Sequence, residues 1–124
     1  MQRGGLDPRQ VAFQGYEARC IKLTKELMGM PGAGFCSRDA DFINVPSYSD
    51  IIPNPLSLEG VMNRIQGKGS GDIKKYTYLN DFALDVRRVF GNFVRFNWYA
   101  DSNTAKLRKE AARVLFKFEQ FWFD

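Results

Sequence analysis

The chain has 124 residues, of which 44% are hydrophobic and 26% are charged, and this length and composition predict one packed globular domain rather than a disordered segment. The absence of histidine excludes histidine-based catalytic triads, histidine general bases and histidine metal ligands. The formal net charge of +4, from 18 basic and 14 acidic residues, favours acidic partners only modestly, because a balance of this size is also ordinary for a soluble protein.

Cysteine content and hydropathy narrow the class of protein further. Cys20 and Cys36 are the only cysteines; they are too few for a zinc site alone, and we interpret both as reduced in an intracellular protein. No apolar run approaches the length of a membrane span and no signal peptide is recognisable, so no membrane partner is expected. We predict that the chain is not an enzyme and holds no metal or cofactor, because no nucleophile–base pair or ligand set can be assembled.

The first of four stretches with helical periodicity should begin near Asp7–Pro8, where aspartate can cap a helix and proline suits its first turn. Pro31–Gly32 should end it. Its apolar positions form one stripe, namely Tyr16, Cys20, Leu23, Leu27 and Met30.

The second stretch is short. Ser57 is a plausible N-cap, and the glycine-rich segment 67–71 should end the helix and form a loop. The apolar stripe between them consists of Leu58, Val61, Met62 and Ile65.

The third stretch should start between Thr77 and Asn80, and the fourth should follow Asp101–Ser102, where either residue can cap it. The apolar face of the third consists of Leu79, Phe82, Val86, Val89, Phe90 and Phe93. That of the fourth consists of Leu107, Ala111, Val114, Phe118 and Trp122. Because no stretch alternates like a strand, the chain is predicted to be an all-α, antiparallel four-helix bundle.

A long connection from Pro31 to about Leu56 lacks helical periodicity. Its apolar residues are too many to leave in water, and they are Phe35, Phe42, Ile43, Val45, Tyr48, Ile51 and Ile52. We therefore expect the connection to pack back on one end of the bundle and to form a wall of an apolar cleft.

Three ordered groups of residues carry a resemblance to a known family. The run 45–58 (VPSYSDIIPNPLSL) resembles the bromodomain loop P-x-Y-x-x-I-I-x-x-P-M-D-L. The spacing of the family's third helix is matched by Tyr76, Phe82, Asp85, Val86, Phe90 and Asn92, followed by Phe96-Asn97 where most members have Tyr-Asn. The closing helix pattern is matched by Ala111, Val114 and Phe118. The resemblance to bromodomains covers roughly residues 16–122.

This resemblance implies a left-handed antiparallel four-helix bundle, with a long first loop and a shorter second loop enclosing an acetyl-lysine pocket. Asn97 would donate a hydrogen bond to the acetyl carbonyl, and Tyr48 would reach the same oxygen through a water molecule. The pocket walls would be formed by Phe35, Ile43, Val45, Phe93 and Phe96, with Trp98 at the rim. The helical register favours Leu107 as the gatekeeper, whereas a loop count gives Asn103 or Thr104.

Acetylation turns the lysine ammonium into a neutral amide, so a reader must accept an apolar stem and donate one hydrogen bond. It must also reject the charged ammonium, whose burial without a partner is costly. The resemblance thus implies a non-catalytic, nuclear reader of acetylated histone tails in chromatin and transcription regulation, monomeric as an isolated domain. Residues 11–124 would form the bromodomain, and residues 1–10 an N-terminal extension or the start of the first helix.

Two alternatives stay open. Only Phe35 remains of the family's Trp-Pro-Phe shelf, and Phe93 stands where small residues are frequent, so a degenerate bromodomain could act as a protein-interaction scaffold. A basic helical nucleic-acid-binding module, or a weak DNA contact beside the reader function, is suggested by Arg87, Arg88, Lys106 and Arg108.

Overall fold

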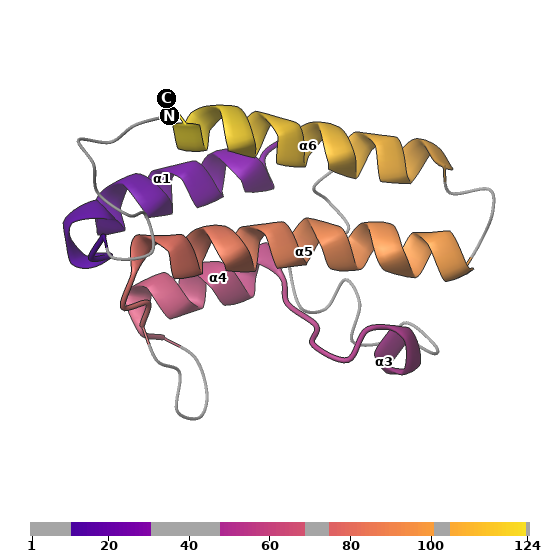
Figure 1. The fold of residues 1–124 in the computed structure, drawn as a ribbon, viewed down its shortest axis with the longest axis horizontal. Coiled ribbons are helices and arrows are strands. Elements are labelled where there is room, and N and C mark those ends of the chain that lie inside the picture. The colour runs from indigo at the N-terminus through magenta and orange to yellow at the C-terminus, as the bar shows by residue number, and fades with distance from the viewer. Residues whose placement is uncertain (1–10, 31–47, 69–74, 101–104, 124) are drawn as a thin grey trace.

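Four long helices form a bundle in the computed structural model, which describes residues 11–30, 48–68, 75–100 and 105–123 (Figure 1). They are α1 (Glu17–Met28), α4 (Leu58–Gln66), α5 (Leu79–Ala100) and α6 (Ala105–Phe123), with a short 3-10 turn η2 (Gln14–Tyr16) and a one-turn helix α3 (Tyr48–Ile51). Around the bundle α1 contacts α4, α4 contacts α5, α5 contacts α6 and α6 contacts α1. No described residue belongs to an extended strand, so the predicted all-α class is confirmed.

The main core lies along the inside of this ring of helices. All six apolar positions predicted for the third helix are buried, and so are Ala111, Val114 and Phe118 of α6. The largest side chains of this core that are fully removed from solvent are Phe13, Phe82, Phe90, Phe118, Leu27, Leu58 and Ile65. Burial of these aromatic and branched side chains supplies most of the stabilisation of the bundle.

The first helix differs at both ends from the sequence prediction. It begins at Glu17 rather than near Asp7–Pro8, and it ends at Met28, before Pro31. Asp7 and Pro8 lie outside the described residues. Residues 11–13 are not helical, because they pair with the segment that precedes α5: the Phe13 amide donates to the Thr77 carbonyl (3.0 Å) and the Leu79 amide donates to the Val11 carbonyl (2.8 Å).

The second helix forms as predicted. Ser57 is its N-cap, and the hydroxyl oxygen of Ser57 accepts a hydrogen bond from the Gly60 amide at 3.0 Å. Gly67 ends the helix in the left-handed conformation, at φ 69°, which glycine adopts without a steric penalty.

Helices α5 and α6 run antiparallel and form the longest contact of the bundle (Figure 1). The predicted start of the third helix is confirmed, but α5 continues through Trp98 and Tyr99 to Ala100. Trp98 is therefore helical, and the proposed caps Asp101 and Ser102 lie outside the described residues. In the described parts of the chain, no helix has the length and apolar character needed to cross a membrane.

Candidate ligand-binding site

A second, smaller apolar cluster lies where α3 meets the C-terminal half of α5 (Figure 1). Tyr48 and Ile52 are buried in it, and Ile51 and Phe96 pack against them. The rings of Tyr48 and Phe96 lie 4.8 Å apart between centroids, with an interplanar angle of 44°, a favourable geometry for two aromatic rings. The end of the long connection thus packs back on the bundle, as the sequence predicts for this segment.

A hydrogen bond holds the chain just after α3 to the same face of α5. The side-chain amide of Asn92 donates to the main-chain carbonyl of Asn54 at 2.8 Å. Asn92 lies one helical turn before Phe96, so the ring contact and the hydrogen bond fasten neighbouring points of the connection to one helix.

Several of the predicted pocket residues lie wholly or partly outside the described part of the structure. Asn97 and Trp98 follow Phe96 in α5, and Leu107 lies in the first turns of α6, but these three side chains lie outside the described part of the structure. The residues that lie outside it altogether are Phe35, Ile43, Val45, Asn103 and Thr104. The structure thus brings together Tyr48, Phe96 and the backbone that carries Asn97.

We call the group of Tyr48, Ile51, Ile52 and Phe96 the Tyr48 cluster. Phe93 does not belong to it but to the main core. Its side chain is 8% exposed and packs with the inward-facing residues of the bundle. It lies three residues before Phe96 on the same helix, so the apolar face of α5 divides between the two clusters. The predicted contact of Phe93 with a ligand therefore stays a prediction.

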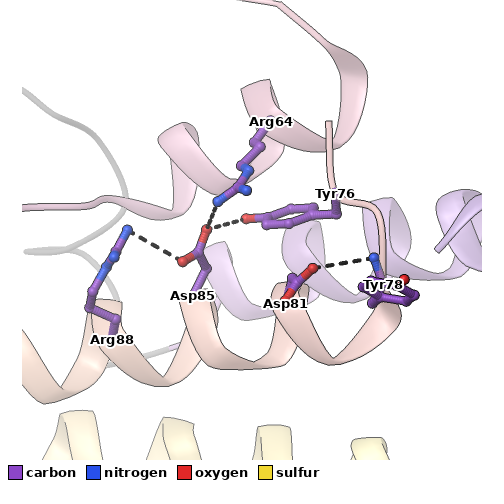
Figure 2. A network of polar contacts seen from close by, with 6 residues as sticks. All are labelled: Arg64, Tyr76, Tyr78, Asp81, Asp85 and Arg88. Carbon is purple, nitrogen blue, oxygen red and sulfur yellow. Dashed lines mark hydrogen bonds and ion pairs between the residues drawn. The ribbon is translucent and has the colours of Figure 1, made fainter. Parts of the chain in front are cut away.

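A buried carboxylate joins α4 to α5 away from this cluster (Figure 2). Asp85 is 6% exposed, and its Oδ2 atom accepts hydrogen bonds from the Tyr76 hydroxyl at 2.7 Å and from the Arg64 guanidinium at 3.0 Å. Its Oδ1 atom lies 3.3 Å from the Arg88 guanidinium. The carboxylate is therefore both charge-compensated and hydrogen-bonded, which the burial of a charge requires.

Tyr76 acts in this network as a permanent hydrogen-bond donor. Burial raises the pKa of its hydroxyl well above the usual range, and the hydrogen bond to Asp85 raises that pKa further. The Arg64 guanidinium lies 4.4 Å from the centroid of the Tyr76 ring, within the range of a cation–π contact. Sequence reasoning singled out Asp85 and Tyr76 by their spacing but missed Arg64, because nothing in its local sequence indicates a partner on α5.

Two arginines on which the nucleic-acid alternative depends have partners within the bundle. Arg87 of α5 makes a two-pronged pair with Glu119 of α6, with distances of 2.7 Å and 2.8 Å. Arg88 pairs with Asp85. Arg108 also has an interaction within the protein, and the side chain of Lys106 lies outside the described residues. The contacts of Arg87 and Arg88 therefore give the nucleic-acid alternative no support.

Cys20 is buried in the main core as a free thiol. Desolvation by burial raises the pKa of this thiol from 9.0 to about 12, which leaves it protonated and unreactive near neutral pH. Cys36 lies outside the described residues. Among the described side chains, no group of three potential metal ligands is found.

The chain resembles known proteins across most of its length. Residues 20–110 match the family model described as Bromodomain. Bromodomain-containing factor 2 of Saccharomyces cerevisiae is 25% identical over 122 residues, covering 94% of this chain and 18% of that protein. E3 ubiquitin-protein ligase TRIM33 of Mus musculus is 33% identical over 76 residues, covering 56% of this chain. An ankyrin repeat, bromo and BTB domain-containing protein of Dictyostelium discoideum is 33% identical over 76 residues, covering 61% of this chain. The chain spans only 6% and 8% of the lengths of these last two relatives.

Proposed function

Because the chain belongs to the bromodomain family, a family of acetyl-lysine-binding modules and not of enzymes, we propose that it reads acetylated lysine with Asn97 and Tyr48 as its polar contacts. One observation supports the choice of site: the Tyr48 ring packs on Phe96 at 4.8 Å, and Phe96 is the residue immediately before Asn97. The resemblance assigns Tyr48 and Asn97 to one ligand. These two residues therefore belong to segments of backbone, α3 and the C-terminal half of α5, that pack against each other.

The chemistry of this arrangement suits an acetylated side chain. The carboxamide of Asn97 would donate to the acetyl carbonyl, and the Tyr48 hydroxyl would reach the same oxygen through a water molecule. The partly exposed side chains of Ile51 and Phe96 in the Tyr48 cluster would offer apolar surface to the methyl group and the lysine stem. An unmodified ammonium would lose its hydration there without gaining a charged partner from the cluster.

The biological setting belongs to the same proposal. Acetylated histone tails are the ligand class that we propose, with a nuclear location and a role in transcription regulation. The ligase activity in the name of one relative is not proposed for this chain, which spans a small fraction of that protein. One small pocket predicts weak binding, with a dissociation constant on the order of tens of micromolar or weaker.

The test is a calorimetric titration of the chain with acetylated and unmodified copies of one histone-tail peptide. Asn97→Ala should weaken binding of the acetylated peptide by about 1–3 kcal/mol, because the ligand carbonyl would be left unpaired. Tyr48→Phe keeps the ring against Phe96 and should weaken binding by about 1 kcal/mol or less. Asn80→Ala, on the same helix but near its other end, is the matched control and should bind normally.

Two results would contradict the proposal. Equal heats with both peptides would show that acetylation is not what the chain recognises. An Asn97→Ala variant that is folded and binds the acetylated peptide like the unaltered chain would remove Asn97 from the site.

A further inference from the structure

The outward surface of α6 combines exposed cations with an exposed aromatic ring. We define the α6 outer face as the residues Lys109, Ala112, Arg113, Phe116, Lys117 and Gln120, which are all exposed. Phe116 is 61% exposed, more than any other large hydrophobic side chain in the described ranges. A phenylalanine in this position contributes little to the bundle itself, because most of its apolar surface stays in water.

The cations of the α6 outer face form one row along the helix. Lys109, Arg113 and Lys117 follow each other at intervals of four residues, which places successive side chains about 6 Å apart on one side of the helix. None of the three has a hydrogen bond or ion pair with a described residue. They differ in this from Arg87, whose charge is already compensated by Glu119.

The apolar residues border this row on the side that faces α5. Glu119 pairs with Arg87 of α5, so the side of α6 that carries Glu119 is the one next to that helix. Phe116 lies three residues before Glu119, and Ala112 lies one turn before Phe116. The face therefore has an apolar edge toward α5 and a cationic edge away from it.

We propose that the α6 outer face binds an acidic amphipathic helix of a partner protein. Carboxylates of that helix would lie opposite Lys109, Arg113 and Lys117, while its apolar side chains would cover Phe116 and Ala112. In Figure 1 α5 lies between α6 and α3, so this surface is on the other side of α5 from the Tyr48 cluster. The two sites can then be occupied together, and the proposal does not depend on acetyl-lysine binding.

Two other occupants fit the surface less well. A duplex nucleic acid would use the cations, but its bases are already stacked on one another and would gain little from the exposed ring. The carboxylates of Glu110 and Glu119 beside the row would also repel its continuous phosphate backbone. A second copy of the chain would bring an equal cationic row toward this one in a two-fold contact, and both copies carry a net charge of +4.

The test uses a designed helical peptide of about 18 residues, roughly the length of α6, with glutamates along one side and leucines along the other. A peptide of the same composition with the order scrambled is the control ligand. In a titration followed by amide NMR, the amphipathic peptide should shift the resonances of residues 109–120 and leave those of Tyr48 and Phe96 unchanged. The scrambled peptide should shift neither set.

Two variants separate the apolar and the cationic contributions. Phe116→Ser should weaken peptide binding by about tenfold or more, the loss expected for one buried aromatic contact; Tyr78→Ser, at another exposed aromatic position, should not. The triple change Lys109→Glu, Arg113→Glu and Lys117→Glu should abolish binding. The control for this variant changes the net charge by the same amount at other exposed positions, Lys22→Glu, Lys25→Glu and Lys68→Glu. It should reduce binding far less.

The outcomes distinguish this proposal from the others. Retained peptide binding by Asn97→Ala, with loss in the Phe116→Ser variant, would support it whether or not acetyl-lysine is bound. Peptide binding that Phe116→Ser does not weaken would overturn it. A duplex DNA that shifts residues 109–120 while the peptide does not would overturn it in favour of nucleic acid. A dimer in sedimentation that Phe116→Ser dissolves would overturn it in favour of a second copy of the chain.

Discussion

Two of the polar connections to α5, one at α4 and one at α3, differ in burial, charge and number of bonds. At the α4 side, Asp85 is buried and accepts contacts from Tyr76, Arg64 and Arg88 (Figure 2). At the α3 side, Asn92 makes one neutral, exposed hydrogen bond to the Asn54 carbonyl. Charge-assisted bonds are roughly twice as strong as neutral ones, and an exposed bond competes with water.

This difference separates the part of the molecule that determines stability from the part proposed to bind the ligand. The junction of α4 and α5 belongs to the main core, where an unpaired group would be costly. The Tyr48 cluster has two buried residues and two that pack against them, so its opening exposes little apolar surface. We expect it to open at a lower free energy than the bundle, as ligand-binding segments commonly do.

The largest expected effect concerns the reactivity of the Cys20 thiol, which is buried in the main core. In a Cys36→Ser variant, the remaining thiol of Cys20 has a pKa of about 12 instead of 9.0, so its thiolate should be on the order of a thousandfold rarer than that of a free cysteine. Its reaction with a thiol reagent at pH 8 should be slower by at least this factor, and unfolding by urea should restore the ordinary rate. Fast reaction in the folded chain would show that the main core opens locally, and it would contradict the expectation that the core opens less readily than the Tyr48 cluster.

The same shift gives a direction for the pH dependence of stability. The folded-state pKa of Cys20 is raised, so its contribution to the free energy of unfolding is fully present below pH 9.0 and is lost as the pH rises toward about 12.

The next largest effect is expected at the buried carboxylate. Asp85→Ala would remove the acceptor of the Tyr76 hydroxyl and the carboxylate that pairs with the Arg64 and Arg88 guanidinium groups, so the free energy of unfolding should fall by about 2–4 kcal/mol. Asp81→Ala, one turn earlier in α5, is the control. Asp81 accepts from the exposed Tyr78 amide at 3.3 Å, and its loss should cost about 1 kcal/mol or less. Urea denaturation measures both, and equal losses would contradict the special role of Asp85.

A smaller effect on binding is expected at the exposed hydrogen bond. Asn92→Ala should weaken binding of an acetylated peptide by about 0.5–1.5 kcal/mol, because the chain after α3 would no longer be held to α5. Its free energy of unfolding should change by less than about 0.5 kcal/mol, the usual range for a surface substitution. Calorimetry and urea denaturation on one preparation separate the two quantities. A loss of stability without a loss of affinity would reverse the assignment of the two regions.

The smallest effect is a gain of stability in α5. Gly91 is exposed in the middle of this helix, and a Cβ atom added there would meet nothing within 4 Å. Gly91→Ala should therefore raise the free energy of unfolding by about 0.5–1 kcal/mol, through the lower conformational entropy of the unfolded chain. Peptide affinity should not change, and a lower midpoint in urea would mean that the glycine has a role that its surroundings do not reveal.

The helices were predictable because their apolar positions recur with the period of one buried face. The start of α1 was not, although Asp7–Pro8 carries a good local capping signal. Residues 11–13 instead pair with residues 77–79, and a local pattern contains no information about a partner so distant in sequence. The helix α3 was missed for a related reason, since its single turn is too short to show a period.

For the candidate site, the sequence predicted which segments meet but not how the polar groups pair. The packing of Tyr48 on the bundle end follows from the apolar content of its connection. The pairing of Arg64 with Asp85 depends on how α4 crosses α5, which no spacing within either helix encodes. The division of Phe93 and Phe96 between two clusters likewise depends on where α3 reaches α5.

The pairing of residues 11–13 with the segment before α5 affects where this domain begins. The ring of Phe13 is fully buried and lies edge-on to Tyr76, with 5.3 Å between the centroids. A shortened chain that starts at residue 20, where the family match starts, would lose this ring and expose the part of the Tyr76 ring that Phe13 covers. Removing a buried phenylalanine side chain costs about 3–5 kcal/mol, a large share of the stability of a small domain, so the smallest self-sufficient folding unit must include the residues upstream of the first helix.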